Sequence, residues 1–180
     1  MHNSIENVLF SGKEIENIVN TLAKNIEKYY NCKEFTCVGL LKGCFIFMAD
    51  LVRKINLDFE IDFMTVSSYR DSVSSSGDVK VISDVRKDVA GKNLLIVDDV
   101  TDTGNTLEFV KNYFIDRGAQ SVKFCTLFDK PQRRVKNIEP DFCGAQIPDE
   151  FIVGYGLDYK GKYRNLPYLG ILNRSVYENK

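Results

Sequence analysis

Apolar residues at helical spacing mark the first predicted element of this chain. Their repeat of three to four residues places them on one face of a helix that we expect over residues 12–30. The apolar positions are Ile15, Ile18, Val19, Leu22 and Ile26. Ser11 and Glu14 have the spacing of a capping box, which marks the beginning of such a helix. Nothing on this helix indicates chemistry, and we interpret it as a packing element.

The rest of the hydrophobic pattern alternates short apolar runs with helical segments. The predicted elements are strands at 35–41, 58–69, 92–100 and 121–128, and helices at 44–55 and 106–117. Gly118 stops the last of these helices. Strands interleaved with helices predict an α/β fold, with a mostly parallel, twisted sheet flanked by helices. In such folds ligands bind at the carboxyl ends of the strands.

A serine-rich segment between Tyr69 and Gly77 interrupts this pattern. It reads RDSVSSS, contains few core-forming residues, and is followed by the strand-like VKVI. A loop of this length in a compact domain is either disordered decoration or a lid over an active site. We favour a lid spanning about residues 68–78.

Composition limits the class of protein. The chain has 180 residues, 44% of them hydrophobic and 27% charged, which suits one domain with a single sizeable core. A formal net charge of −1 provides no global attraction for nucleic acid or an anionic membrane, although a local basic patch stays possible. No apolar run approaches the roughly 20 residues of a membrane span, and the N-terminus lacks the features of a signal peptide. We therefore expect a cytoplasmic protein.

The cysteines and the single histidine exclude several kinds of chemistry. Five cysteines, an odd number without a C-x-x-C pair, predict buried free thiols rather than a disulfide framework or a metal site. The only histidine, His2, lies at a terminus that we expect to fray. Catalytic triads and histidine-based zinc sites need a positioned imidazole, so acid–base work falls to Asp, Glu, Lys or Tyr.

The stretch LLIVDDVTDTGNTL, residues 94–107, is the strongest candidate for a functional site. A buried strand leads to two adjacent carboxylates, Asp98 and Asp99, and then to a turn of small residues that opens a helix. Backbone N–H groups in such a turn and the positive end of the helix favour a phosphate. Neighbouring acids suit sugar hydroxyls, a metal ion or a proton. The pattern predicts a sugar phosphate ligand with magnesium.

An ordinary structural role is the alternative for this stretch: a polar strand end followed by an Asx turn that caps the next helix. The chain has neither a Walker loop nor a G-x-G-x-x-G motif, which argues against triphosphate hydrolysis and nicotinamide chemistry. Two further polar pairs also fall at predicted strand ends, Lys42-Gly43 and Asp129-Lys130. Their coincidence with the acid pair favours a functional site.

Several motifs together resemble the hypoxanthine-guanine type of purine phosphoribosyltransferase. They are LLKG at 40–43, SSY at 67–69, IVDDVTDTGNT at 96–106, FDKP at 128–131 and PDEFIVGYGLDYKGKYRNLP at 148–167. Their order and spacing match the family from about Phe35 to Leu172. The chain departs from it at Asp98, where the family commonly has Glu, and at Thr101, where it has an aliphatic residue.

The resemblance implies transfer of a phosphoribosyl group from phosphoribosyl pyrophosphate to a free oxopurine, with Mg²⁺ as cofactor. It assigns Asp98 and Asp99 to the ribose hydroxyls or a metal, and Asp158 both to magnesium and to the purine-binding residues. It also implies that the turn wraps the ribose phosphate; the turn residues are Asp102, Thr103, Gly104, Asn105 and Thr106. Asp102 matches the proposed general base at the imidazole-ring nitrogen of the purine, its ordinary alternative being a turn-forming, helix-capping Asp.

The resemblance also assigns the purine and pyrophosphate contacts. Phe151 corresponds to the stacking aromatic, Lys130 to the donor to the purine oxygen, and Ile152 to a backbone contact with the ring edge. From the residues alone, Phe151 and Ile152 equally suit a buried strand, and Lys130 a solvated surface. Pyrophosphate contacts are implied for the Lys42-Gly43 backbone and for Arg164. A non-proline cis peptide near Leu41-Lys42 is implied as well.

The same resemblance suggests how the chain is organised. It implies one type I phosphoribosyltransferase domain over 1–180, with a core at about 12–145, a small hood built mostly from 146–180, and Ser68 and Tyr69 in the lid. A homodimer or homotetramer is expected, with no nucleic-acid or membrane partner. Two alternatives stay open: a transferase that prefers xanthine, and a nucleotide-sensing RNA-binding regulator on the same fold. The Arg133-Arg134 pair is too short a basic cluster to decide for the regulator.

Overall fold

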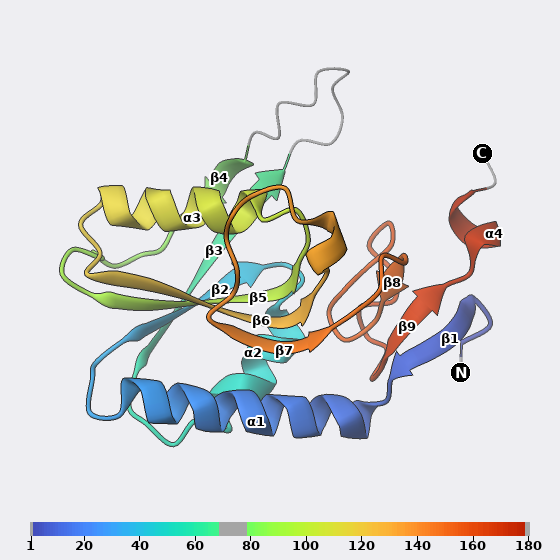
Figure 1. Cartoon of the computed structure of the whole chain (residues 1–180), viewed down its shortest axis with the longest axis horizontal. Helices are drawn as coiled ribbons and strands as arrows, with labels where there is room; N and C mark the ends of the chain where they lie inside the picture. Colours follow the sequence, from blue (N-terminus) through green and yellow to red (C-terminus); the bar gives the residue numbers. More distant parts are fainter. Residues whose placement is uncertain (1, 69–78, 179–180) are drawn as a thin grey trace.

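The computed structural model describes residues 2–68 and 79–178, and a large sheet forms its centre. The strands of this sheet are β2 (Thr36–Leu41), β3 (Glu60–Ser68), β4 (Val79–Ser83), β5 (Asn93–Thr101), β6 (Ser121–Asp129) and β7 (Phe142–Gln146). Their spatial order is β4-β3-β2-β5-β6-β7 (Figure 1). The pairs from β3 to β7 are parallel, and β4 is antiparallel at the edge. The predicted mostly parallel α/β sheet is confirmed.

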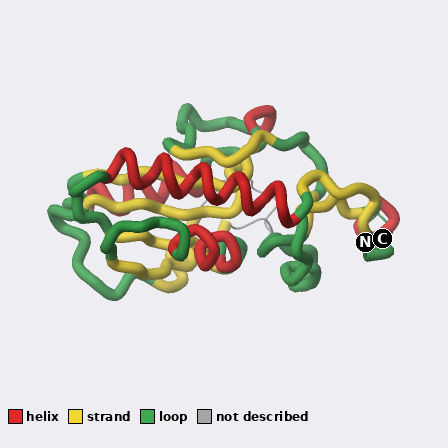
Figure 2. Tube along the Cα trace, turned by 90° about the horizontal axis from the view of Figure 1, so that it is seen from below, coloured by secondary structure: helices red, strands yellow, loops and turns green. Residues whose placement is uncertain are grey.

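Helices cover both faces of the large sheet. Helices α1 (Gly12–Tyr30) and α2 (Phe45–Val52) lie on one face and α3 (Asn105–Asp116) on the other (Figure 1). Successive side chains of a strand point to opposite faces, and β5 shows the effect. Its Leu95 packs in the core beneath α1 and α2, whereas Leu94 packs in the core beneath α3. Figure 2 shows α1 lying lengthwise along its face of the sheet.

The helix boundaries follow local hydrogen bonds. At the beginning of α1, Ser11 and Glu14 form the predicted capping box. Helix α2 ends three residues before the predicted boundary, because the Lys54 N–H donates to the Leu51 carbonyl at 2.9 Å and tightens the chain into a turn. No helix within the described residues is both long and apolar enough to cross a membrane.

A second, smaller sheet forms a hood beside the large one (Figure 1). It contains β1 (Ile5–Phe10), β9 (Leu169–Leu172) and β8 (Ile152–Val153), in the order β1-β9-β8 and antiparallel throughout. The short helix α4 (Arg174–Tyr177) follows β9, and the 3₁₀ turn η1 (Pro131–Arg133) follows β6. The sequence did not predict β1: of its six residues only Ile5 is buried, and its partner β9 lies at the far end of the chain.

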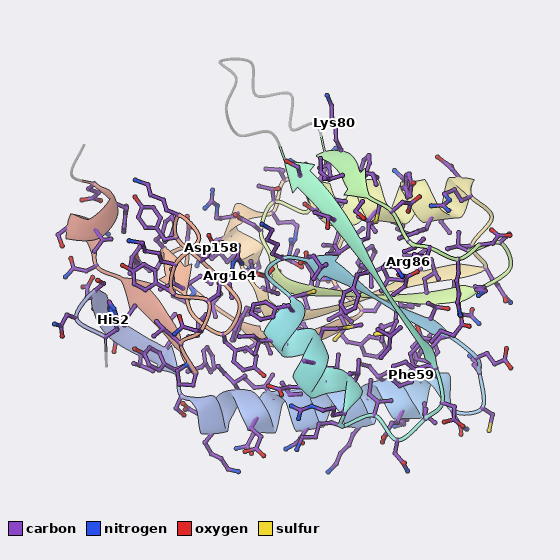
Figure 3. The ribbon with its side chains drawn as sticks, turned by 180° about the vertical axis from the view of Figure 1, so that it is seen from behind. His2, Phe59, Lys80, Arg86, Asp158 and Arg164 are labelled. Carbon is purple, nitrogen blue, oxygen red and sulfur yellow. The ribbon has the colours of Figure 1, made fainter. Side chains whose placement is uncertain are left out.

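The N-terminus is held against this hood. The backbone N–H of His2 donates to the Tyr168 hydroxyl at 3.0 Å, and its ring meets Tyr163 edge-on at 5.3 Å between centroids. Figure 3 shows His2 at the hood end of the molecule. The expectation that this terminus frays is not supported by these contacts.

All five cysteines are free, as predicted, but their burial differs. The buried ones are Cys37, Cys44 and Cys125. The prediction of buried thiols is wrong for Cys32, which lies in the turn after α1, and for Cys143, which lies on the edge strand β7. The apolar character of the flanking sequence therefore does not carry these two side chains into the core.

Thiol reactivity at pH 8 follows from this burial. We expect one of the five thiols, Cys32, to react rapidly with a disulfide reagent in the native protein. Cys143 reacts more slowly although it is exposed, because partial burial raises its pKa to about 11 and leaves little thiolate. A time course of reagent release should show one fast equivalent, and all five after denaturation. Rapid release of three equivalents from the native protein would contradict the packing described.

Candidate active site

The polar strand ends predicted from the sequence meet around one cavity. It has a volume of about 490 Å³ and lies at the carboxyl ends of β2 and β5. The predicted residues that line it are Lys42, Gly43, Asp98, Asp99, Asp102, Thr103, Gly104, Asn105 and Thr106. Arg133 lines it as well and was not assigned to the site from the sequence. Cavities of about 750 and 720 Å³ lie elsewhere, away from these side chains.

Two adjacent carboxylates form one wall of this cavity. The Asp99 N–H donates to Asp98 Oδ1 at 3.0 Å, and the Val100 N–H donates to Asp99 Oδ1 at 2.8 Å. Burial raises the pKa of Asp98 well above its ordinary value, and the neighbouring Asp99 raises it further. Burial also raises the pKa of Asp99. Both carboxylates are therefore disfavoured in their charged form, and a cation bound between them would stabilise that form.

The donor set of this pair fits magnesium. Mg²⁺ is commonly held by one or two carboxylates while water and substrate phosphates complete its octahedron. Within the described residues, no group of three or more His, Cys, Asp or Glu side chains gathers to hold a metal ion by itself. Two carboxylates leave coordination positions of the ion free. A magnesium ion that is shared with a phosphate ligand requires such positions.

Neutralising the pair should stabilise the free protein. We expect Asp98→Asn to raise stability at pH 8 by about 1 kcal/mol, or roughly 2–4 °C in Tm, because it removes a disfavoured charge. A carboxyl whose pKa is raised on folding destabilises the fold above its unfolded pKa, and this cost disappears as falling pH protonates it. The difference between variant and wild type should therefore shrink between pH 8 and pH 4. Thermal unfolding without magnesium measures it; a variant that is less stable at pH 8 would contradict the electrostatic account.

The Lys42-Gly43 segment packs directly against the acid pair. A Cβ placed on Gly43 would lie 1.7 Å from Asp99 Oδ2, so no side chain fits there. The Leu41-Lys42 peptide is cis, as the family resemblance implies. The backbone at this point therefore faces the carboxylate wall without an intervening side chain.

The turn after the acid pair is held from outside the cavity. Its Thr103 carbonyl accepts hydrogen bonds from the N–H groups of Val135 and Lys136, at 3.0 and 3.1 Å. Gly104 adopts a left-handed conformation (φ 87°) at the N-cap of α3, where a Cβ would also approach Ile138 and Lys136. The Asn105 N–H donates to Thr103 Oγ1 at 3.4 Å, and the first turn of α3 lines the cavity with Thr106 and Leu107, as an anion site at a helix N-terminus requires.

Asp102 lies in this turn beside two arginines. Its Oδ1 is 2.9 Å from Arg133 Nε, without hydrogen-bond geometry, and Oδ1 is buried and accepts no hydrogen bond within the described protein. Arg134 Nη1 donates to the Asp102 carbonyl at 2.8 Å and also pairs with Asp129. Gly104, not Asp102, occupies the N-cap of α3, so Asp102 is not a helix cap. Its Oδ1 is ion-paired with Arg133 but accepts no hydrogen bond, which leaves it able to accept a proton or a donor from a ligand.

The predicted purine contacts come from β6 and the hood. Lys130 is buried, and its Nζ donates to the Glu150 carbonyl at 2.7 Å, so the solvated alternative is wrong. Ile152 is buried in β8, as a strand residue would be. Phe151 is 36% exposed and stacks on Tyr177 at 5.1 Å, which excludes a fully buried position. No signal in the sequence indicated Tyr177.

Asp158 and Arg164 are not among the residues that line the cavity. They pair with each other in the hood, Asp158 Oδ1 to Arg164 Nη2 at 2.5 Å (Figure 3). The Arg164 Nη1 also donates to the Gly156 carbonyl at 2.6 Å. The structure therefore shows both residues in an internal ion pair, and their contacts with magnesium and pyrophosphate stay predictions. The lid prediction falls on 68–78, which apart from Ser68 at the end of β3 lies outside the described residues, Tyr69 included.

The departure at Thr101 has a local explanation. Thr101 is buried, and its hydroxyl is 2.9 Å from that of Thr126 on the neighbouring strand β6. A buried hydroxyl is costly unless it is hydrogen-bonded, and the second threonine supplies the partner. Thr101 also lines the cavity, and this hydrogen bond accommodates its polar side chain there.

The fold and this arrangement of carboxylates and phosphate turn define a class of protein, and sequence comparison gives the same class. A family model described as the phosphoribosyl transferase domain matches residues 7–160. The match includes every strand of the large sheet and all cavity residues.

Relatives over the full chain narrow this class. A hypoxanthine-guanine phosphoribosyltransferase from Staphylococcus aureus is 44% identical over 179 residues, covering 99% of this chain and 100% of the relative. A crystal structure of a hypoxanthine phosphoribosyltransferase from the same organism superposes with a TM-score of 0.94, covering 99% and 97% of the two chains. The Trypanosoma cruzi hypoxanthine phosphoribosyl transferase, at 34% identity, superposes with a TM-score of 0.93, covering 99% and 96%. The chain belongs to the hypoxanthine-guanine phosphoribosyltransferase family.

Proposed function

We propose that this protein transfers the phosphoribosyl group of phosphoribosyl pyrophosphate to hypoxanthine, and also to guanine, giving IMP or GMP and pyrophosphate. The observation that carries the proposal is the single cavity in which the acid pair, the Gly43 backbone and the phosphate turn converge. Relatives named for this reaction support it, and they favour the enzyme over an RNA-binding regulator. The role in the cell is purine salvage.

In this proposal the two sides of the cavity bind different parts of the donor substrate. The turn from Asp102 to Thr106 holds the ribose phosphate through backbone N–H groups and the start of α3. Asp98 and Asp99 would hold the ribose hydroxyls and a magnesium ion, and the bound ion would supply positive charge to the pyrophosphate. The Lys42-Gly43 backbone donates to the pyrophosphate from the opposite side. Arg164 and Asp158 reach the donor and the metal once their internal ion pair rearranges.

Proton transfer falls to Asp102. When a ring nitrogen of the purine bonds to the ribose carbon and the C–O bond to pyrophosphate breaks, the base must lose a proton. The buried Asp102 Oδ1 accepts that proton from the imidazole ring. Phe151 stacks on the purine, Lys130 donates to its exocyclic oxygen, and the Ile152 backbone contacts the ring edge.

A panel of bases tests the proposal. The protein is incubated with phosphoribosyl pyrophosphate, magnesium and hypoxanthine, guanine, xanthine or adenine separately, and the nucleotide formed is measured. Transfer to hypoxanthine and guanine is expected, and transfer should require magnesium. Preference for xanthine would establish the nearest alternative enzyme. Retention of RNA without transfer to any base would refute the proposal in favour of a regulator.

We also propose a homodimer or homotetramer that works in the cytoplasm. Large apolar side chains are exposed beside the edge of the sheet; they are Phe45, Ile61, Phe63 and Ile82, from α2, β3 and β4. Such a group of exposed apolar residues is typical of a protein–protein contact. Five free thiols support a reducing compartment. Light scattering during size exclusion measures the mass of the assembly.

A further inference from the structure

The hood meets the core along a seam that contains charged side chains and a cavity of about 720 Å³. Its walls come from the beginning of α1, from α2, and from the hood segment before β9. At one end of the seam Gly12 lies against Pro167, whose carbonyl would be 2.7 Å from a Cβ on Gly12. The two parts therefore touch at this end of the seam and leave a cavity along the rest of its lining. Individual contacts across the seam therefore fix the position of the hood.

A partly buried hydrogen bond crosses this seam. The Tyr155 hydroxyl donates to Asp50 Oδ2 on α2 at 2.5 Å, joining residues 105 positions apart. Tyr155 is 7% exposed, and burial together with this bond raises its pKa, so the hydroxyl stays protonated and acts as the donor. Asp50 also accepts from Arg53 one turn along the helix, which fixes the carboxylate.

The Tyr155 backbone is held in a conformation that needs support. Its φ of 48° lies in the left-handed region, which is unfavourable for an aromatic residue. Its N–H donates to the Leu166 carbonyl at 2.9 Å, and the next N–H, of Gly156, donates to the Arg164 carbonyl at 3.0 Å. The hydrogen bond to Asp50 thus anchors the base of the loop that carries Asp158 and Arg164.

The same loop touches the pyrophosphate side of the site. A Cβ on Gly156 would lie 2.1 Å from the Gly43 carbonyl, so the two backbones are in direct contact. Gly43 in turn contacts Asp99, and α2, which carries Asp50, begins at Phe45. Tyr155 therefore ties the hood to the helix that follows the Lys42-Gly43 segment.

We propose that the Tyr155–Asp50 hydrogen bond is a positioning contact that sets the purine-binding hood at the correct distance from the phosphoribosyl cavity. Neither residue touches substrate. Their effect passes through the loop 154–166 and through β8 to Phe151 and Ile152. This inference rests on the proposed function, because it assigns the hood to the purine and the cavity to the phosphoribosyl donor.

Tyr155→Phe tests the contact by removing one hydroxyl. At saturating phosphoribosyl pyrophosphate we expect the KM for hypoxanthine to rise about tenfold, equivalent to about 1.4 kcal/mol, while kcat changes less than threefold. Asp50→Ala should produce the same change. Asp50→Asn should retain most of the wild-type KM, because its amide oxygen still accepts the hydrogen bond. The double variant Tyr155→Phe/Asp50→Ala should be no worse than either single one, since both remove the same interaction.

Tyr113→Phe is the matched control. Tyr113 also donates to a carboxylate, Asp84, at 2.7 Å, but it lies on α3, on the face of the sheet opposite α2 (Figure 1). If Tyr155→Phe lowers stability as Tyr113→Phe does and leaves the KM unchanged, the contact is merely structural and the proposal is overturned. Asp50→Ala provides the same comparison should Tyr155→Phe fail to fold, because it removes the acceptor of the same hydrogen bond.

Hydrogen exchange gives a readout that does not depend on activity. In the ligand-free protein, Tyr155→Phe should accelerate exchange of the amides in 151–166 by about tenfold and leave those of β5 unchanged. Unchanged protection of 151–166 would overturn the inference even if no base were a substrate. Failure of the wild type to act on any base, with accelerated exchange in the variant, would instead refute the proposed function alone.

Discussion

Replacing Asp102 with asparagine is expected to lower kcat by about 10²- to 10⁴-fold, the usual contribution of a positioned acid or base. The substitution keeps the size of the side chain and removes its ability to take a proton. Asp102 lines the cavity that we assign to the phosphoribosyl donor, and its Oδ1 is buried beside Arg133 and accepts no hydrogen bond from the described residues. Steady-state turnover with hypoxanthine measures the effect, and thermal unfolding verifies that the variant is folded.

Asp149→Asn provides a control for this loss. Asp149 is the other carboxylate near Arg133, at 3.4 Å from its Nη1, but it is exposed and does not line the cavity. Turnover of this variant should stay within about twofold of wild type, as expected of an exposed ion pair. Near-normal turnover of a folded Asp102→Asn protein would remove Asp102 from the mechanism. An equal loss in both variants would transfer the role to Arg133.

Gly43→Ala is expected to reduce kcat/KM for phosphoribosyl pyrophosphate by about 10²-fold or more. The added methyl group would stand 1.7 Å from Asp99 Oδ2, so either the carboxylate or the backbone must move by more than an ångström. Displacements of that size at a reacting centre commonly cost about two orders of magnitude. Both movements would disturb the proposed contacts of magnesium and pyrophosphate, whereas purine contacts in the hood lie farther away. Kinetics with each substrate varied in turn measure the effect.

Gly91→Ala is the matched control for a glycine-to-alanine change. Gly91 has a φ of 71°, so alanine is strained there, but a Cβ would meet nothing within 4 Å. This variant should lose about 1 kcal/mol of stability and retain its turnover. Wild-type kinetics in Gly43→Ala would contradict the close packing of Asp99 on this backbone.

Local patterns predicted the sheet because its causes are local. The apolar run at 94–97 alternates between the two cores, and the capping box of Ser11 and Glu14 begins a helix by contacts three residues apart. The chain direction also predicted that the strand ends would meet, since parallel strands place their carboxyl ends at one edge. The cavity residues from β2 and β5 were therefore accessible to sequence reasoning.

Contacts between segments that are far apart in the sequence could not be predicted in this way. Strand β1 is stabilised by β9 and has only one buried side chain, so its sequence carries little strand signal. In the sequence, Arg133 and Arg134 form only a short basic cluster. The turn η1 nevertheless brings Arg133 Nε to 2.9 Å from Asp102 Oδ1. Tyr177, near the end of the chain, stacks on Phe151 for the same reason. Such pairings depend on how elements dock, which neither periodicity nor residue type encodes.

The sequence by itself determined the α/β class, the phosphate turn with its acid pair and, through ordered motifs, the family. These properties arise from residues that are neighbours in the chain, where spacing alone sets the geometry. Only the tertiary structure decided that Lys130 is buried and Phe151 exposed, that Asp158 pairs with Arg164, and that Tyr155 ties the hood to α2. Those outcomes depend on burial and on contacts across the seam, where the nearest atoms belong to residues far apart in the chain.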